Sequence, residues 1–328
     1  MRPLSFQLLR VLSHDRFTSG TKLAAQFGVS RTLVSEALRE ASSAGVEIFS
    51  LTRRGYRLAE PFELLDLTRI RKILGVNGVR VDIDIAESIP STNSELMARA
   101  GLGAPSGACI AAETQTAGRG RRGRTWQSAP GASLTFSLLW RFEKGAPQLG
   151  GLSLVVGLAV LRVLRKLGAG AADIKLKWPN DIVCGGRKLG GVLIETQGDM
   201  LGPTAAVIGI GLNVRLPEAL KESIDQPVCD VAGLMATAIS RNALLATVLA
   251  ELIAMLDQFQ ASGFTAFKAE WLTVHALQGK HVNVLAGDGK TTHAEVIGVH
   301  DDGSLIVLQH GREMALSSGE VSLRPHRP

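Results

Sequence analysis

The chain has 328 residues, of which 45% are hydrophobic and 20% are charged, and it carries a formal net charge of +6 with a pI of about 9.5. A hydrophobic share of this size excludes a disordered chain and predicts roughly two or three packed domains. The excess of positive charge favours an anionic partner, and DNA, a nucleotide or an acidic protein would each fit it.

Cysteine usage and hydropathy indicate a cytoplasmic protein. Three widely spaced cysteines without a CxxC motif favour neither disulfides nor zinc, and the seven histidines have no metal-ligand spacing. Residues 1–16 lack the cleavage site of a signal peptide. The most apolar stretch, 150–161, has about 12 residues before Arg162, which predicts a buried helix and no membrane partner.

The first 60 residues predict a winged helix-turn-helix domain. Apolar residues recur at helical spacing in 4–12, 19–28 and 30–38, and strands are expected at 46–50 and 56–58. In such a domain the third helix lies in the DNA major groove and the basic hairpin is the wing. The residues expected to contact bases or phosphates are Ser30, Arg31, Thr32, Ser35, Arg53 and Arg54. A protein-docking domain is the alternative, because Glu36 and Glu40 give the recognition helix mixed charge.

Short polar residues follow the first strand expected in the middle of the chain, 79–86. Ser91, Thr92 and Asn93 come where that strand passes into a helix, and Thr92 and Glu95 have the spacing of a capping box. These residues either cap the helix, the simpler interpretation of the local sequence, or bind a polar small molecule at the end of the sheet.

A glycine- and arginine-rich loop, GRGRRGRTWQS at 118–128, follows a buried strand at 108–113 and Gln115. Alternating glycines let backbone amides approach a ligand closely, and arginines match phosphate or carboxylate groups. The loop therefore predicts an anion-binding site. The alternative is a solvated run that touches nucleic acid without specificity.

Glycine-bearing strands are expected after this loop. A strand at 135–140 and an apolar helix at 152–167 precede a tight turn, KWPND at 177–181, and a hairpin with Gly185 and Gly186 at its tip. The hairpin is followed by Arg187, Lys188, Gly190 and Gly191 and then by a strand at 205–214. Glycines inside strands indicate that a ligand or a second backbone passes close by.

The rest of the chain predicts two helices and a small all-β domain. A helical stripe begins at Asn242, another helix is expected at 264–274, and the period changes to two beyond Gly279. The β segment has GDGK and DDG turns, a last strand near 320–323, and the size of a small β-barrel. We expect an α+β protein with a winged helix-turn-helix at 1–63, a mixed-sheet α/β domain at 64–275 and the small β-barrel at 276–328.

Five motifs in this order resemble those of the bacterial biotin protein ligases. They are STN at 91–93, GRGRRGRTWQS at 118–128, KWPNDI at 177–182, KLGGVLIE at 188–195 and GIGLNV at 209–214. The winged helix, with Gly55 and Tyr56 in its wing, and the ending GEVSLR are similar to the bifunctional members, which also repress biotin synthesis genes. The resemblance covers essentially the whole chain and implies a central domain of the biotin/lipoate ligase type.

The resemblance implies a two-step reaction. The biotin carboxylate attacks the α-phosphate of ATP to give biotinyl-5'-AMP and pyrophosphate. A lysine of the biotin carboxyl carrier protein of acetyl-CoA carboxylase then takes the biotinyl group. ATP and Mg²⁺ are the implied cofactors, and biotinyl-5'-AMP is implied as co-repressor of a ligand-dependent homodimer on operator double-stranded DNA.

On this resemblance, Lys188, Arg121 and Asp181 are expected to act in catalysis. Lys188 would stabilise charge on the α-phosphate, and Asp181 would orient Mg²⁺ or, alternatively, cap the turn at Pro179. Trp126 would stack on the nucleotide or anchor the loop. The residues expected to bind biotin or biotinyl-5'-AMP are Ser91, Thr92, Asn93, Gln115, Gly118, Arg119, Gly120, Arg121, Trp126, Lys188, Gly190, Gly191 and Asn213.

Two further expectations concern the loops and the overall activity. The loop 118–128 is expected to be a lid that is disordered when empty and ordered over the adenylate, whereas 215–230 has no aromatic residue and so argues against a stacking lid on adenine. The alternatives to a ligase that is also a repressor are a biotin-sensing repressor with little transfer activity and a monofunctional ligase with a non-regulatory winged helix.

Overall fold

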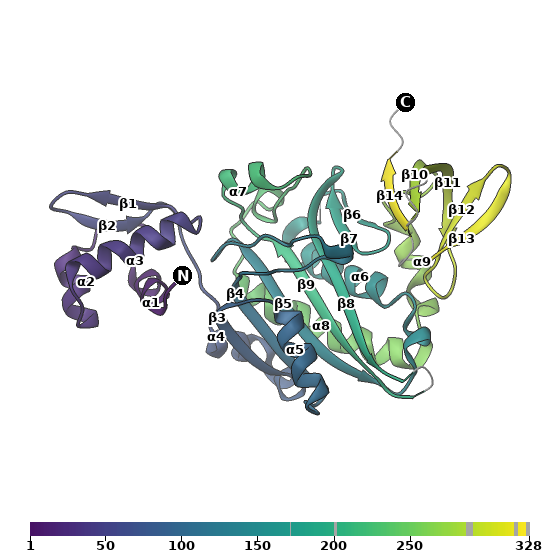
Figure 1. Ribbon diagram of the computed structural model, residues 1–328, viewed down its shortest axis with the longest axis horizontal. Helices are drawn as coiled ribbons and strands as arrows, with labels where there is room; N and C mark the ends of the chain where they lie inside the picture. The colour runs from purple at the N-terminus through teal and green to yellow at the C-terminus, as the bar shows by residue number, and fades with distance from the viewer. Residues whose placement is uncertain (171, 200–201, 287–290, 318–320, 326–328) are drawn as a thin grey trace.

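The computed structural model describes residues 1–170, 172–199, 202–286, 291–317 and 321–325. Three parts follow one another along the chain in Figure 1: a small helical domain with a hairpin, a central domain built on a large sheet, and a C-terminal sheet. The predicted α+β class and the order of its parts are confirmed.

The N-terminal domain has the expected three helices and wing. Its elements are α1 (Pro3–Val11), α2 (Gly20–Phe27), α3 (Arg31–Ser43), β1 (Ile48–Leu51) and β2 (Gly55–Leu58). Ser19 and Ser30 cap α2 and α3 with their hydroxyl oxygens, and Gly28 ends α2 in the left-handed region at φ +64°. These caps produce the short turn that sets the recognition helix α3 against α2.

The central domain is built on a seven-stranded mixed sheet. Its strands in spatial order are β3 (Asp82–Ile89), β4 (Ala108–Gln115), β5 (Ser133–Phe142), β9 (Thr204–Asn213), β8 (Arg187–Gly198), β7 (Asp181–Cys184) and β6 (Ile174–Lys177). β3 and β4 are parallel and all other neighbours are antiparallel. The first strand begins at Asp82, later than expected, because residues 75–80 form a 3-10 helix.

Helices cover the two faces of this sheet unequally (Figure 1). One face carries α4 (Leu67–Leu74), α6 (Leu152–Leu164) and α8 (Arg241–Ser262), and the other carries α5 (Thr92–Gly101). Side chains alternate between the faces, as the pleat requires: Ile208 of β9 belongs to the large core under α6 and α8, whereas Val207 packs with Leu96 of α5. The face that carries α5 is therefore partly open.

Within the described part of the chain, two helices are long and apolar enough to span a membrane by length and composition, Ala146–Ala169 and α8. Their apolar windows are 67% and 61% buried inside the protein, which identifies them as core helices. Most residues of α6 are buried, in agreement with the prediction of a buried helix over 150–161, and Arg162 near its end pairs with Glu251 and Glu270.

The C-terminal domain is all-β, as expected, and follows the short helix α9 (Thr265–Thr273). Its strands are β10 (His281–Ala286), β11 (Thr291–Val299), β12 (Leu305–Gln309), β13 (Arg312–Leu316) and β14 (Val321–Pro325). They form an antiparallel sheet in the order β13-β12-β11-β10-β14. The expected GDGK turn at 287–290 and Glu320 lie outside the described residues.

The DDG turn docks this sheet on the central domain. The Gly303 carbonyl accepts a hydrogen bond from the Trp178 indole at 3.0 Å. A Cβ at Gly303 would lie 2.4 Å from Gly151 Cα, and a Cβ at Gly150 would lie 2.4 Å from the Asp302 carbonyl oxygen. Only glycines permit this approach of the two backbones, so the C-terminal domain directly supports the KWPND turn.

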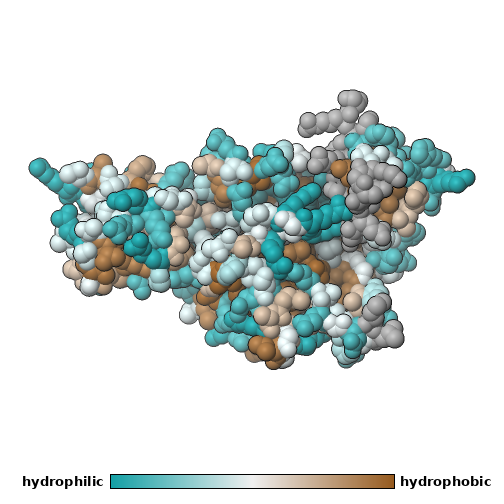
Figure 2. All heavy atoms as spheres, in the orientation of Figure 1, coloured by the Kyte–Doolittle hydropathy of each residue, from teal (hydrophilic) through white to brown (hydrophobic). Residues whose placement is uncertain are grey.

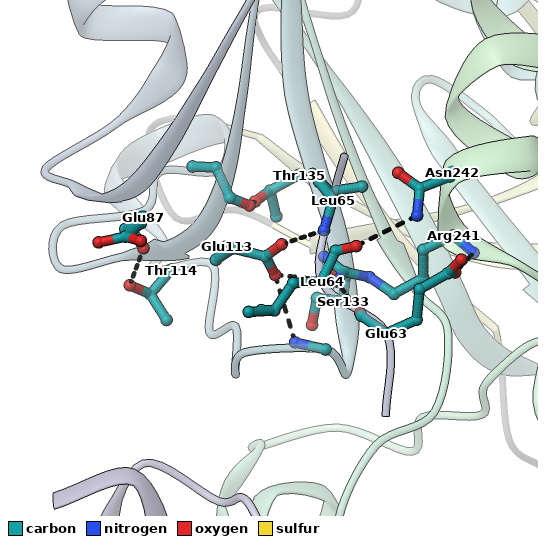
Figure 3. A network of polar contacts seen from close by, with 12 residues as sticks. Glu63, Leu64, Leu65, Glu87, Glu113, Thr114, Ser133, Thr135, Arg241 and Asn242 are labelled. Atoms are coloured by element: carbon teal, nitrogen blue, oxygen red, sulfur yellow. Dashed lines mark hydrogen bonds and ion pairs between the residues drawn. The ribbon is translucent and has the colours of Figure 1, made fainter. Parts of the chain in front are cut away.

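A buried ion pair ties residues 63–65, the linker that follows the winged helix, to the central sheet (Figure 3). Arg241 at the start of α8 lies 2.8 Å from Glu113 of β4, and these side chains are only 3% and 0% exposed. Glu113 also accepts from the backbone amides of Leu65 and Gly131, and Arg241 donates to the Ser133 carbonyl. The network joins the segment after the winged helix to the loop that precedes β5.

His275 should make the protein less stable in acid. Burial lowers its pKa from 6.5 to about 4, because the ring packs against Trp271 and the charged form loses water. The unfolded chain binds this proton below about pH 6.5, whereas the folded chain binds it only below about pH 4. The contribution of neutral His275 to the free energy of unfolding is therefore fully present above pH 6.5 and falls by about 3 kcal/mol as the pH drops toward 4. Urea unfolding across this range should show the loss, and His275→Leu should reduce the slope; an equal slope in both proteins contradicts the assignment.

Candidate active site

Glycines of β9 make room for two side chains on the open face of the sheet, beside the start of α5. A Cβ at Gly209 would lie 2.1 Å from Asn93 Oδ1, and a Cβ at Gly211 would lie 2.5 Å from the Trp126 ring. Both side chains therefore lie flat against the sheet, and any larger residue at either glycine would displace them.

The glycines of β8 behave in two ways. A Cβ at Gly191 would be in contact with the end of the Lys188 side chain, whereas a Cβ at Gly190 would lie 2.8 Å from the Gly211 carbonyl oxygen of the neighbouring strand. Gly190 therefore lies close to a second backbone, which is one of the two possibilities expected from the sequence. For Gly191, Gly209 and Gly211 the approaching group is a side chain.

Ser91, and not Thr92, is the N-cap of α5. The Ser91 hydroxyl oxygen accepts from the Ser94 amide at 3.4 Å, so the capping box expected from Thr92 and Glu95 was one residue out of register. Thr92 is the first residue of the helix, and its side chain turns to the sheet.

A chain of polar side chains crosses the start of α5. Gln115 Oε1 accepts from the Thr92 amide at 2.7 Å and lies 3.1 Å from the Thr92 hydroxyl. Ser137 Oγ of β5 lies 2.7 Å from Thr92 Oγ1 and 2.6 Å from Asn93 Oδ1, and Asn93 Nδ2 donates to Glu195 Oε2 at 2.9 Å. Five residues from α5, β4, β5 and β8 thus form one network of groups suited to a neutral polar ligand.

The loop 118–128 folds back on itself across the open face of the sheet (Figure 1). Trp126 N donates to the Gly118 carbonyl at 2.9 Å and Gly120 N donates to the Arg124 carbonyl at 2.7 Å, while Arg122 adopts a left-handed conformation at φ +56°. Hydrophilic side chains gather across the middle of the molecule in Figure 2, and hydrophobic ones border them.

Two arginines of this loop point to different partners. Arg119 Nη2 lies 2.7 Å from Glu195 Oε2 at the edge of the polar chain. Arg121 Nη1 donates to Asn180 Oδ1 at 3.2 Å, and burial, followed by the charge of Arg122, lowers its pKa. A guanidinium stays protonated even so, and burial strengthens its attraction for an anion.

Lys188 lies between the loop and the sheet. Its ammonium is 2.7 Å from Asp181 Oδ1 and 5.9 Å from the centre of the Trp126 ring. The β7–β8 pairing has a bulge at this point, where Ile182 pairs with Gly190 but Val183 pairs with Lys188. A bulge redirects the side chain beside it, and here that side chain is the lysine.

The KWPND turn is held from several sides. Trp178–Pro179 is a cis peptide, the Ser153 hydroxyl of α6 donates to the Pro179 carbonyl at 2.9 Å, and Asn180 Nδ2 donates to the Val192 carbonyl at 2.7 Å. Asn180 therefore presents its other amide atom, Oδ1, to the arginine loop.

The segment 215–230 lies next to Lys188 and contains the short helix α7 (Glu218–Ser223). Lys188 N donates to the Pro227 carbonyl and Cys229 N donates to the Lys188 carbonyl, both at 2.9 Å. A cavity of about 370 Å³ is lined by Arg187 and residues 218–234. Neither Lys188 nor any aromatic residue is among the residues that line this cavity.

Most of the residues predicted for the site lie together, but Asn213 does not reach into it. Its amide donates to the carbonyls of Lys188 and Cys229, which holds the segment 215–230 against β8. Ser137, Asn180 and Glu195 were not among the site residues predicted from the sequence. The latter two were inside the quoted motifs, whereas Ser137 in mid-strand had no local signal.

The face predicted to bind DNA is exposed. Arg31 and Thr32 begin α3, and Arg53 adopts φ +65° at the tip of the wing. Arg54 lies 4.8 Å from the centre of the Phe17 ring, beside an open groove of about 680 Å³ lined by Asp15, Arg16, Phe17, Arg54 and Arg57. The sequence interpretation had not included Arg16 and Arg57.

The donor set fits an acyl-adenylate. The Trp126 indole N–H is buried and has no partner among the described residues, and such a group normally has one. It lies with Lys188 and Arg121 around the floor of the site. A polar end, an apolar border and a cationic end are the features that a ligand with a neutral ring, an acyl chain and a phosphate requires.

A winged helix joined to this sheet and followed by a small β domain defines a protein ligase of the biotin/lipoate class with an N-terminal DNA-binding module. Family models agree: the biotin/lipoate A/B protein ligase family matches residues 85–213, an HTH domain matches 5–57, and the biotin protein ligase C-terminal domain matches 278–324. The bifunctional ligase/repressor BirA of Salmonella typhimurium is 35% identical over 97% of this chain and 96% of its own length. The chain belongs to the family of bifunctional biotin ligase/repressors.

Two further comparisons each cover about three quarters of this chain. The biotin--[acetyl-CoA-carboxylase] ligase of Mycobacterium tuberculosis is 32% identical over 76% of this chain and 92% of its own. The biotin protein ligase from Aquifex aeolicus, solved in complex with biotin and ATP, is 27% identical with a TM-score of 0.63, over 75% of this chain and 99% of that one.

Proposed function

We propose that this chain is an ATP-dependent biotin protein ligase that forms biotinyl-5'-AMP and transfers biotin to a lysine of the biotin carboxyl carrier protein of acetyl-CoA carboxylase. The observation that carries the proposal is the site itself. A chain of polar side chains at the start of α5 and a cationic group of Lys188 and Arg121 face the same open side of the sheet. Family membership and the similarity to a ligase solved with biotin and ATP support it.

Each end of the site suits one part of the adenylate. The ureido ring would lie against Ser91, Thr92, Asn93 and Gln115, because burying its N–H and C=O groups without partners would be costly. The carboxylate and the phosphates would lie among Arg119, Arg121 and Lys188. Backbone of Gly118, Gly120, Gly190 and Gly191 would border the ligand, and Trp126, which lies flat against β9, would form part of the floor beneath it.

Positioning and charge stabilisation are the catalytic terms that these residues supply. Arg121 and Lys188 would bring two anions together that otherwise repel each other, and Lys188 would stabilise the charge that develops on the α-phosphate. The mixed anhydride is then the activated species and the carrier lysine is the nucleophile, so transfer requires no nucleophilic side chain of the ligase.

Mg²⁺ is proposed as a substrate-bound cofactor. Among the described residues no group of three or more His, Cys, Asp or Glu side chains is arranged to hold a metal. Asp181 is a single carboxylate already paired with Lys188, which fits Mg²⁺ only when phosphates supply most of its ligands. Bound in that way, the ion would neutralise phosphate charge, and Asp181 would orient it.

Labelling of the carrier tests the ligase directly. Purified protein with biotin and ATP should label one lysine of the biotin carboxyl carrier protein, as measured by mass spectrometry. Carrier that stays unlabelled while the protein binds biotin would favour the alternative, a biotin-sensing repressor with little transfer activity.

Arg121→Gly should release the adenylate early. The change removes a half-buried guanidinium and its bond to Asn180, so the loop loses one of its attachments over the intermediate. We expect free biotinyl-5'-AMP to appear in solution at least ~10 times faster, and nearby lysines of other proteins to become biotinylated. Filtration of labelled adenylate measures the release; retention equal to wild type contradicts the role.

We propose that the same chain represses transcription as a biotinyl-5'-AMP-dependent homodimer on two-fold operator DNA in the cytoplasm. The exposed start of α3 and the basic wing support DNA binding, and Ser30, Ser35 and Arg54 are among the proposed contacts. Gel shifts at several salt concentrations distinguish the functions, because specific binding survives competitor DNA and phosphate contacts give a steep salt slope. Binding that ignores the adenylate favours a monofunctional ligase with a non-regulatory winged helix.

A further inference from the structure

We infer that Glu195 is the positioning residue that joins the ureido end of the site to the arginine loop and sets which groups that end offers to a ligand. The inference rests on the proposed function. Glu195 Oε2 lies 2.9 Å from Asn93 Nδ2 and 2.7 Å from Arg119 Nη2, so one carboxylate oxygen accepts from both α5 and the loop. Glu195 is half-buried in β8, and Asn93 is 4% exposed.

The carboxylate fixes the direction of the neighbouring hydrogen bonds. Because it can only accept, the Asn93 amide must turn its nitrogen toward Glu195, and the Leu193 carbonyl at 3.3 Å accepts from the same nitrogen. Asn93 Oδ1 then faces Ser137 Oγ at 2.6 Å and takes the one hydroxyl proton of Ser137.

The direction of the Thr92 hydroxyl hydrogen bond is fixed as a result. Its hydroxyl lies 2.7 Å from Ser137 Oγ and 3.1 Å from Gln115 Oε1, and it must give its single proton to one of these oxygens. Toward a ligand, Thr92 Oγ1 can therefore only accept. Gln115 Oε1 is occupied by the Thr92 amide at 2.7 Å, which leaves the Gln115 amide nitrogen as a donor.

An acceptor beside a donor matches a neutral ring that carries both N–H and C=O. A carboxylate offers only acceptors, and a guanidinium offers only donors, so each would leave one protein group unpaired. Glu195 thus acts on specificity through Asn93, Ser137 and Thr92 without touching the ligand. Through its contact with Arg119 it also fixes the position of the loop relative to these residues.

Two substitutions separate this role from a packing role. Glu195→Met keeps the length of the side chain and removes the acceptor, whereas Glu195→Gln keeps one oxygen. We expect Glu195→Met to raise the dissociation constant and the KM for biotin about tenfold or more, and to lower the preference for biotin over 2-iminobiotin. Glu195→Gln should stay within about threefold of wild type.

Asp84 provides a matched control for Glu195. Asp84→Met removes another carboxylate that pairs with α5, through Arg99, and should change none of these values. Glu195→Met combined with Arg119→Met should be less than additive, since both remove the same link. A folded Glu195→Met protein with wild-type biotin affinity and wild-type preference overturns the inference.

Biotin binding is measured by calorimetry without ATP, in parallel with pyrophosphate release. A wild type that binds biotin but releases no pyrophosphate overturns the ligase, while the binding data still decide the role of Glu195. A wild type that does not bind biotin overturns both proposals.

Discussion

Lys188→Ala is expected to lower the rate of biotin-dependent pyrophosphate release by about 10²- to 10³-fold, with a much smaller change in the KM for biotin. Lys188 is 2.7 Å from Asp181 and lies over Gly191, so its ammonium is held in place before any substrate binds. A preorganised charge of this kind acts on the transition state more than on the ground state, which is why the rate should fall and not the affinity.

The control for this experiment addresses the carboxylate that Lys188→Ala leaves behind. Lys188→Ala with Asp181→Ala removes both charges and should remain as slow as Lys188→Ala alone. Lys175→Ala, which breaks an exposed pair with Asp173 elsewhere in the sheet, should be as active as wild type. A rate for Lys188→Ala within threefold of wild type contradicts the assignment.

Arg241→Met is expected to destabilise the protein by about 3–5 kcal/mol, the largest effect on folding of any change considered. The variant leaves Glu113 buried at 0% exposure without its cation, in the network that also holds the Leu65 and Gly131 amides. Urea unfolding measures the difference. Lys268→Met, which breaks an exposed pair with Asp301, should cost at most about 1 kcal/mol.

The double variant Arg241→Met with Glu113→Met distinguishes charge from packing. If an unpaired carboxylate causes the loss, removing it as well should recover part of the stability. A loss below about 1 kcal/mol for Arg241→Met would show that the network does not hold the linker to the sheet.

Local signals in the sequence were enough to predict most helices and strands, although not all of their ends. Ser30 before an apolar stripe predicted the start of α3, and Gly185 and Gly186 between two strands predicted the β7–β8 hairpin, because caps and turns depend on neighbouring residues. The error at Thr92 had the same origin, since Ser91 offers an equally suitable cap one residue earlier.

The contacts of the site could not be predicted in this way. Glu195 and Asn93 are 102 residues apart, and Arg241 and Glu113 are 128 apart, so only the strand order brings each pair together. The domain boundaries at 63 and 275, the roles of the individual site residues and the ordering of the loop 118–128 by ligand stay predictions.

Pyrophosphate release with biotin, lipoate and octanoate as competing acids tests the central claim most directly. The polar chain from Gln115 to Glu195 suits a ureido ring, whereas lipoate and octanoate have no N–H or C=O group at that end. We expect rapid pyrophosphate release with biotin and at least ~100-fold slower release with the other two acids. Equal rates with all three, or release with lipoate alone, would contradict it.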